Sequence, residues 1–251
     1  MNAKEKAIFC WSGGKDSALC LHRVLRAGDY EVVCLLTTCN AHFHRVSMHG
    51  VRVELLEAQA AAIGLPLEKI FVGQPSTNEE YAAKMEAVLR RYKTLGVETV
   101  IFGDIFLEDL RLWRENNLAK IGMRGLFPLW KIDSRLLLEE FVALGFGSIL
   151  CCVNDAYLDE TFAGKKIDYD FLNTLPPHVD PCGENGEYHS FAFAGPIFKQ
   201  PLRIRVGEKI YRPIEQTHPT SAVCPPSSDA AKRPTQGFWF CELLLEDSPT
   251  T

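Results

Sequence analysis

Short apolar segments alternate with longer amphipathic segments over about residues 7 to 153, and this alternation limits the fold more than any other feature of the chain. The segments with strand character are Ala7–Trp11, Glu31–Thr38, Leu67–Gly73, Thr99–Gly103 and Ser148–Val153. The segments with helical periodicity are Ser17–Ala27, Val51–Ile63, Asn78–Leu95, Leu107–Ile121 and Ser134–Leu144. Strands that follow one another through helices pair in parallel. The sequence therefore predicts an α/β fold, a doubly wound parallel sheet with helices on both faces.

The chain changes character at about residue 156. A short helix is predicted at Asp168–Leu175, and strands are predicted at Glu187–Phe193, Ile197–Val206 and Gly237–Glu246. The segment His218–Pro234 is rich in Pro, Ser and Thr, which is typical of a loop. We therefore expect a larger domain over residues 1–155 and a smaller α+β region over residues 156–251 that closes over it.

The segment Ser12-Gly13-Gly14-Lys15-Asp16-Ser17 joins the first predicted strand to the first predicted helix. Two adjacent glycines let the backbone curl so that its N–H groups face an anion, and the start of a helix adds partial positive charge. Lys15 adds a full charge. The spacing is not that of a Walker A loop, since Lys15 is followed by Asp16. The alternative is an ordinary turn with Ser12 as helix cap, but a cap needs neither two glycines nor a lysine. We expect a phosphate-binding loop.

Further polar residues follow the predicted strands. Ligands of doubly wound sheets bind beyond the carboxyl ends of the strands, where Thr37, Gly103 and Asp104 are expected. Thr37 is predicted to contact a nucleoside, although a β-branched residue is also ordinary in a strand. Arg111 and Arg114 are predicted to approach phosphates or a carboxylate, the alternative being solvated residues on a polar helix face. Asp16 is predicted to hold Mg²⁺ that bridges phosphates.

A second polar segment, Asp180 to Ser190, comes just before a predicted strand. It holds the carboxylates Glu184 and Glu187, two glycines and His189. Carboxylates can hold Mg²⁺ or orient an amine, and histidine can move a proton near neutral pH. The alternative is a glycine-containing turn with solvated acids.

Composition excludes several classes of protein. The net charge of −5 offers no overall basic surface for nucleic acid, and no apolar stretch approaches the length of a membrane span. The nine cysteines include no C-x-x-C pair, which indicates a reducing, cytoplasmic location. Cys39, His42, His44 and His49 do not have the spacing of a structural zinc site, so we expect a loop that covers the base of a bound nucleoside instead.

The loop at Ser12–Ser17 resembles the SGGKDS loop of the N-type ATP pyrophosphatases. Together with the downstream motif from Gly183 to Phe191, it makes the chain similar to the diphthine–ammonia ligase family. Between these two motifs, further segments resemble internal motifs of that family and occur in the same order, including Ser47-Met48-His49 and Gly103-Asp104-Ile105. Asp104 departs from the small residue usual there, and the stretch from His42 to Arg52 is closer to bacterial relatives.

The resemblance implies a Rossmann-like domain of the adenine nucleotide alpha-hydrolase (HUP) type, with a smaller C-terminal domain that presents the substrate. It implies ATP-dependent amide formation, in which a carboxylate attacks the α-phosphorus, pyrophosphate leaves, and ammonia then displaces AMP. The carboxylate is left open between a small molecule and a protein side chain such as diphthine. ATP and Mg²⁺ are the expected cofactors, no membrane partner is expected, and a homodimer stays open. A tRNA-modifying enzyme with this loop and a non-catalytic ATP sensor remain as alternatives.

The residues expected to act in this chemistry form two overlapping sets. The catalytic set is Lys15, Asp16, Glu184, Glu187 and His189. The nucleotide-binding set is Ser12, Gly13, Gly14, Lys15, Asp16, Ser17, Thr37, His49, Gly103, Asp104 and Arg111. Asp16 is the one expected metal ligand.

Overall fold

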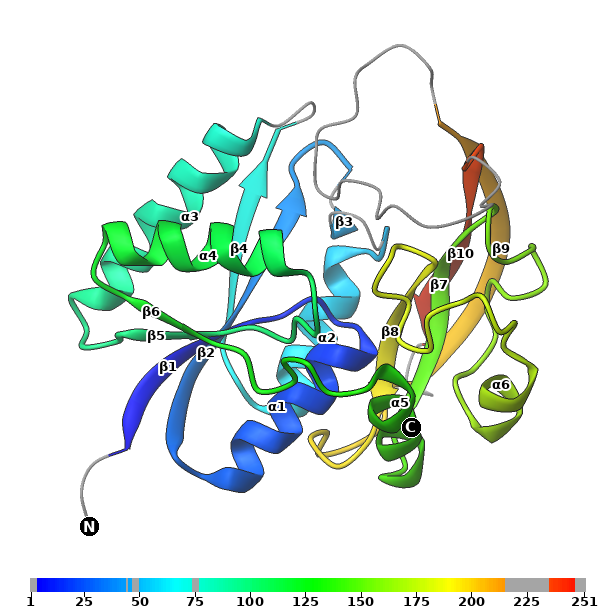
Figure 1. The fold of residues 1–251 in the computed structure, drawn as a ribbon, viewed down its shortest axis with the longest axis horizontal. Coiled ribbons are helices and arrows are strands. Elements are labelled where there is room, and N and C mark those ends of the chain that lie inside the picture. The colour runs from blue at the N-terminus through cyan, green and yellow to red at the C-terminus, as the bar shows by residue number, and fades with distance from the viewer. Residues whose placement is uncertain (1–3, 44, 47–49, 74–76, 215–234, 247–251) are drawn as a thin grey trace.

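The computed structural model of the protein describes residues 4–43, 45–46, 50–73, 77–214 and 235–246. Two sheets organise them (Figure 1). The first sheet contains five parallel strands: β1 (Glu5–Cys10), β2 (Tyr30–Asn40), β4 (Leu67–Val72), β5 (Thr99–Ile101) and β6 (Arg124–Leu126). A short strand, β3 (Arg45–Val46), pairs antiparallel with the end of β2.

The order of the parallel strands places β1 in the middle. It pairs with β2 on one side and with β5 on the other, while β4 lies beyond β2 and β6 beyond β5. The chain thus builds outward from β1 in one direction and then returns to build in the other. The carboxyl end of β1 is the point where the winding direction switches, and such points form the ligand crevices of open α/β sheets.

Four helices connect these strands: α1 (Lys15–Ala27), α2 (Val53–Ile63), α3 (Asn78–Lys93) and α4 (Glu108–Lys120). Helices α1 and α2 end at Gly28 and Gly64, which adopt positive φ angles of 74° and 87° and donate their N–H groups back to the last turn. Helix α3 begins at Thr77, whose side chain accepts a hydrogen bond from the Glu80 N–H.

The second sheet is antiparallel and has the order β8-β7-β10-β9. Its strands are β7 (Gly147–Asn154), β8 (Tyr188–Ala194), β9 (Ile204–Pro213) and β10 (Gly237–Leu245). Helices α5 (Ser134–Ala143) and α6 (Tyr169–Thr174) pack beside it, and Asp133 and Asp168 cap their N-termini through side-chain oxygens.

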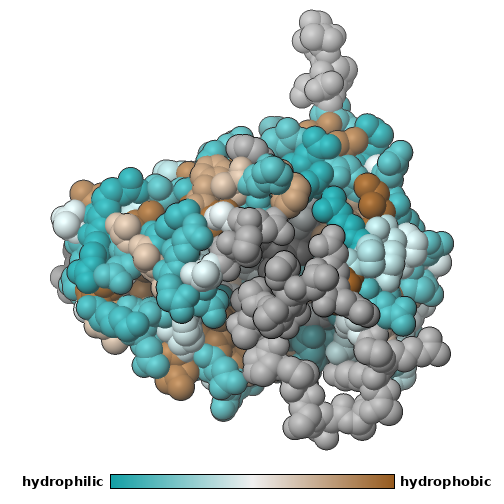
Figure 2. Space-filling view, turned by 90° about the horizontal axis from the view of Figure 1, so that it is seen from above, coloured by the Kyte–Doolittle hydropathy of each residue, from teal (hydrophilic) through white to brown (hydrophobic). Residues whose placement is uncertain are grey.

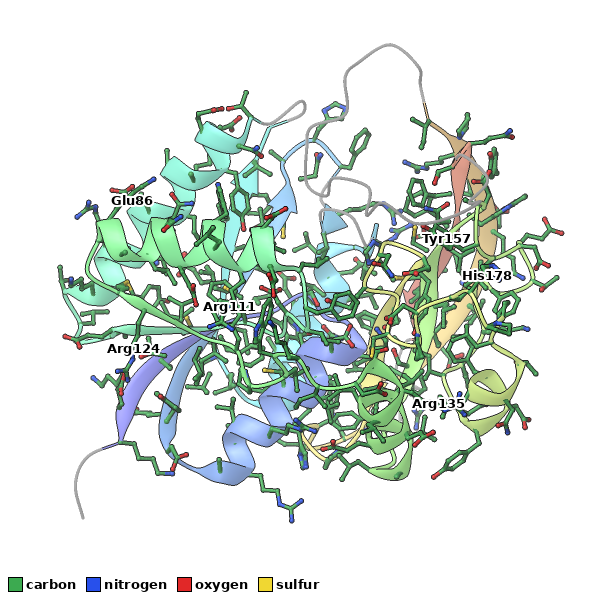
Figure 3. All side chains as sticks on the ribbon, in the orientation of Figure 1. Glu86, Arg111, Arg124, Arg135, Tyr157 and His178 are labelled. Atoms are coloured by element: carbon green, nitrogen blue, oxygen red, sulfur yellow. The ribbon has the colours of Figure 1, made fainter. Side chains whose placement is uncertain are left out.

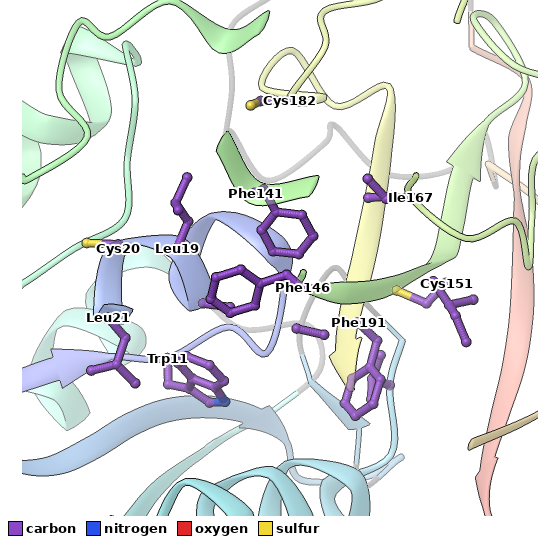
Figure 4. Packing of buried hydrophobic residues seen from close by; sticks show 14 of the residues in the cluster. Trp11, Leu19, Cys20, Leu21, Phe141, Phe146, Cys151, Ile167, Cys182 and Phe191 are labelled. Atoms are coloured by element: carbon purple, nitrogen blue, oxygen red, sulfur yellow. The ribbon is translucent and has the colours of Figure 1, made fainter. Parts of the chain in front are cut away.

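Two apolar cores hold the fold together. One lies between the first sheet and helices α3 and α4. The other is shared by the first sheet, α1, α2, α5 and the second sheet. Figure 4 shows this shared core, where Phe141 and Phe146 stack with ring centroids 4.7 Å apart and Trp11 and Phe191 approach from the two sheets. The second sheet is therefore packed directly against the helix that begins at the phosphate-loop segment.

The predicted fold class is confirmed, and the strand and helix predictions of the first region are correct in type. One assignment is wrong. The segment Ser148–Val153 was expected in the parallel sheet, but it forms β7 of the antiparallel sheet, because α5 leads the chain away to pair with β8 and β10. The division of the chain at residue 155 stays a prediction.

Three further details differ from the sequence prediction. The strand expected at Ile197–Val206 begins only at Ile204, and the short strands β3 and β6 were not expected. The predicted loop His218–Pro234 lies outside the described residues.

Within the part of the chain that the structure describes, no helix is both long and apolar enough to traverse a bilayer. On the face shown in Figure 2, the coloured residues are mostly hydrophilic, with apolar ones in small groups.

Candidate active site

The segment from Ser12 to Ser17 forms a tight bend between β1 and α1. Gly13 has a φ of 80°, and a Cβ atom at this position would lie 2.7 Å from Leu56 Cδ2. Both the conformation and the contact therefore require glycine. The Ser12 and Ser17 hydroxyls are 3.0 Å apart, and the Gly14 N–H donates to Ser12 Oγ at 3.3 Å. Hydroxyl and amide donors thus gather at the start of α1, as phosphate binding requires.

Lys15 is buried, with 3% of its surface exposed, at the first position of α1. Its ammonium donates to Asp16 Oδ2 at 2.7 Å and to the Cys182 carbonyl, and it lies 4.9 Å from the centre of the Tyr188 ring. Burial is the largest influence and disfavours the charged form, but the Asp16 carboxylate, Tyr188 and Cys182 together outweigh it and hold the pKa of Lys15 above its usual value. Lys15 is therefore charged, and its ammonium is paired with Asp16 of the same loop.

Gly103 and Asp104 follow β5 and lie against the loop. A Cβ at Gly103 would lie 3.3 Å from the Ser17 N and from the Asp16 carbonyl oxygen, so this strand end closely approaches the first turn of α1. The Asp104 carboxylate pairs with Arg114 Nε at 2.8 Å. Burial raises the pKa of Asp104, with the Arg114 charge acting against this and Asp16 adding to it. Asp104 is thus close enough to Asp16 for the two charges to interact.

The Asp180–Ser190 segment divides its carboxylates between two roles. Glu187 is fully buried and accepts hydrogen bonds from the Asp180 N–H (3.2 Å), the Asn185 N–H (2.9 Å) and the Asn185 side chain (3.1 Å). These bonds lie within its own segment, so Glu187 shapes the turn. Glu184 instead accepts from the Ile105 N–H at 3.3 Å, in the loop after β5. Its side chain therefore bridges to the Gly103–Asp104 corner.

Glu184 is, with Asp104, a carboxyl of the site whose pKa is raised. Burial, followed by the Asp16 charge, raises its pKa to about 8, while Lys15 acts in the opposite direction. A carboxyl with a pKa near neutrality can take up or release a proton during a reaction. His189 lies on β8 in register with Cys152 and is partly exposed.

The remaining predicted residues have separate environments. Thr37 is buried on β2, and its Oγ1 has no hydrogen-bond partner among the described residues. Arg111 lies over Trp130 and Phe127, 4.6 and 4.8 Å from the ring centres, and pairs with Glu115 at 2.8 Å (Figure 3). These contacts hold Arg111 beside Glu115, Phe127 and Trp130, and among the described residues none of them involves the Ser12–Ser17 loop. His49 lies outside the described residues.

Other residues also belong to this site. Arg114, which was expected with Arg111 near phosphates or a carboxylate, pairs with Asp104. Sequence reasoning gave no role to Cys182 and Tyr188, whose carbonyl and ring contact the Lys15 ammonium, or to Gln59, which contacts the loop. Gln59 could have been noticed as a polar residue within the apolar stretch of α2. In the part of the chain that the structure describes, no three His, Cys, Asp or Glu side chains gather as a metal site.

Comparisons with known proteins identify the family of the chain. Residues 5–125 match the diphthamide synthase N-terminal domain, and residues 133–217 match the diphthamide synthase C-terminal domain. The relatives include the diphthine–ammonia ligase of Schizosaccharomyces pombe, 29% identical over 78% of this chain and 35% of that protein. Those of Danio rerio and Homo sapiens are each 26% identical, over 79% and 94% of this chain and 86% and 91% of theirs.

The chain spans about a third of the fission-yeast relative and most of the two vertebrate ones. The two matched domains together cover most of this chain, from the phosphate loop through the Asp180–Ser190 segment. The chain therefore belongs to the diphthine–ammonia ligase family, which is a family of ATP-dependent ligases.

Proposed function

We propose that the protein is an acid–ammonia ligase that activates a carboxylate with ATP, releasing pyrophosphate and then AMP. The observation that carries this proposal is the joining of two features at the carboxyl end of β1. The Ser12–Ser17 loop offers donors and the Lys15 charge to phosphates, and the Glu184 carboxyl with its raised pKa is held against the same corner.

In the first step a carboxylate oxygen of the substrate attacks the α-phosphorus, and the bond from that phosphorus to the β-phosphate oxygen breaks. The Gly14 N–H, the Ser12 and Ser17 hydroxyls and Lys15 bind the β- and γ-phosphates, so that charge developing on the leaving pyrophosphate is stabilised. The products of this step are an acyl-adenylate and pyrophosphate.

In the second step the nitrogen of ammonia attacks the acyl carbon, the bond to the AMP oxygen breaks, and one proton leaves the nitrogen. Ammonium is cationic at neutral pH, so it also has to lose a proton before it attacks. We assign Glu184 as the group that accepts a proton from the nitrogen, because its raised pKa lets it accept and return a proton near neutral pH.

The residues present fit one Mg²⁺ bound together with ATP. Mg²⁺ in nucleotide sites is usually held by one or two carboxylates, substrate phosphates and water, which agrees with the lack of a three-residue cluster among the described residues. We assign Asp16, which is partly exposed beside the loop, as the protein ligand. When bound, the ion neutralises phosphate charge.

The roles proposed for the other predicted residues follow from their places. Thr37 is proposed to meet the nucleoside, since its buried hydroxyl has no partner among the described residues. Glu187 is proposed to position Glu184 through the turn, and His189 to line the acceptor side. The name of the relatives makes diphthine the first carboxylate to test.

The test supplies ATP, Mg²⁺, ammonium and a diphthine-bearing protein or candidate acids, and measures nucleotide products and amide together. Equal amounts of AMP, pyrophosphate and amide support the proposal, whereas ADP as the nucleotide product contradicts it. Glu184→Gln should bind ATP but form little amide. Turnover of Glu184→Gln at the normal rate would refute the role of this residue.

A further inference from the structure

Gln59 is a buried polar side chain that the chemistry proposed above does not use. It belongs to α2 and has no exposed surface. Its Nε2 donates to the Gly13 carbonyl oxygen at 2.9 Å and to the Ala192 carbonyl oxygen of β8, and its Oε1 accepts from the Trp11 indole at 2.9 Å. All three partners lie at or beside the phosphate loop, so the amide is fully engaged around it.

The bond to Gly13 fixes one particular peptide group of the loop. The Gly13 carbonyl also accepts from the Ala192 N–H at 2.8 Å, so two donors hold it on the side of α2 and β8. A peptide group is planar and, except before proline, trans, so its N–H points opposite to its C=O. The Gly14 N–H is therefore turned the other way, toward Ser12 Oγ and the start of α1.

Glycine on both sides of this peptide group makes its orientation easy to reverse, because no Cβ resists the change. Reversal would turn the Gly13 carbonyl oxygen toward the Ser12 and Ser17 hydroxyls, where it would repel a phosphate. The hydrogen bonds of Gln59 and Ala192 stabilise the orientation that presents a donor. Because the Trp11 indole donates to the Gln59 oxygen, rotating the amide group by 180° would break that hydrogen bond.

We propose that Gln59 is a positioning residue that locks the Gly13–Gly14 peptide group in its phosphate-binding orientation, and that Trp11 sets the direction of the Gln59 amide. Gln59 also joins the loop to the second sheet, because the same Nε2 group donates to the Ala192 carbonyl of β8. That the ligand is the pyrophosphate part of ATP rests on the proposed function. That Gln59 holds the orientation of the peptide group is independent of the proposed function.

The main test compares Gln59→Met with the unaltered protein by calorimetric titration with pyrophosphate, and then with adenosine, each with Mg²⁺. Methionine keeps the length of the side chain but makes none of the three hydrogen bonds. Because a hydrogen bond of this kind corresponds to about a tenfold change in affinity, pyrophosphate should bind at least about tenfold more weakly. Adenosine, which has no phosphate, should bind as before.

Thr99→Val is the matched control. Thr99 is also fully buried and hydrogen-bonded, to Glu5 and Arg124, but it lies beside Ala7 toward the opposite end of β1. It should lower the melting temperature without changing pyrophosphate affinity. An unchanged pyrophosphate affinity in Gln59→Met, or an equal loss for adenosine and pyrophosphate, would overturn the proposal.

A second measurement needs no ligand. Amide hydrogen exchange at Gly14, followed by NMR, should be at least about tenfold faster in Gln59→Met than in the unaltered protein, because the peptide group is released. If the unaltered protein binds no pyrophosphate, the proposed function fails, but exchange at Gly14 still tests whether Gln59 holds the peptide group. Unchanged exchange at Gly14 in Gln59→Met refutes the role proposed for Gln59. If Gln59→Met does not fold, Trp11→Phe removes only the indole donor and should shift both readouts in the same direction by a smaller factor.

Discussion

The pKa of Glu184 gives a prediction about stability that needs no substrate. Burial and the Asp16 charge raise this pKa from 4.5 to about 8 in the folded protein, whereas the unfolded chain keeps the ordinary value. Below pH 4.5 the carboxyl is protonated in both states and costs nothing. Between pH 4.5 and about 8 the unfolded chain loses this proton and the folded protein keeps it, so stability falls as pH rises.

The size of the effect follows from the width of that window. Each pH unit corresponds to about 1.4 kcal/mol, so the window of about 3.5 pH units gives about 5 kcal/mol of lost stability above pH 8. Partial exposure of the side chain to solvent reduces this, and we expect about 3 kcal/mol. Glu184→Gln keeps an oxygen that can accept from the Ile105 N–H but cannot ionise. The free energy of unfolding of Glu184→Gln should therefore equal that of the unaltered protein at pH 4.5 and exceed it at pH 9.

Urea denaturation of both proteins at several pH values from 4.5 to 9 measures this difference, because the titration of groups that do not interact with Glu184 is the same in both proteins. Glu139→Gln is the control, since it changes a carboxylate of α5 that pairs with Arg135 across one helical turn on the surface. It should not reproduce the pH-dependent gain. A difference between Glu184→Gln and the unaltered protein that stays constant with pH would refute the assigned burial and charge environment.

Three other predictions concern the loop and its neighbours. Lys15→Met should weaken pyrophosphate binding by at least about tenfold in calorimetric titration, since it removes the buried ammonium. Arg114→Leu should cost about 3 kcal/mol in urea denaturation, because the Asp104 carboxylate would be left buried and unpaired; adding Asp104→Ala should recover most of this loss. Gly13→Ala should lower the unfolding free energy by about 1–3 kcal/mol, because its φ of 80° and the 2.7 Å approach to Leu56 both disfavour a side chain.

The elements of the first region could be predicted because their signals are local. Apolar runs and glycine stops identify β1 and α1, and the two glycines after β1 identify the bend between them. The sheet to which β7 belongs could not be predicted in the same way. Its apolar sequence fits a parallel or an antiparallel partner, and the choice depends on β8 and β10, which come much later in the chain.

The candidate site shows the same limit. Glu184 and Glu187 are equivalent in sequence, yet the Glu184 side chain bridges to Ile105 and the Glu187 side chain accepts hydrogen bonds from Asp180 and Asn185 of its own segment. Gln59 stands out as polar in an apolar helix, but its partner Ala192 is 133 residues away. Residue types therefore indicated the kind of chemistry, while long-range hydrogen bonds decided which side chains take part.

The contacts between β8 and the loop have a consequence for how the protein is made. Ser190 accepts from the Lys15 N–H across 175 residues of chain, and Ala192 donates to Gly13. A ribosome synthesises the loop early and these partners late, so the nascent chain lacks them until it has passed residue 192. Competence to hold a nucleotide should accordingly arise only after β8 has left the ribosome and packed against the loop.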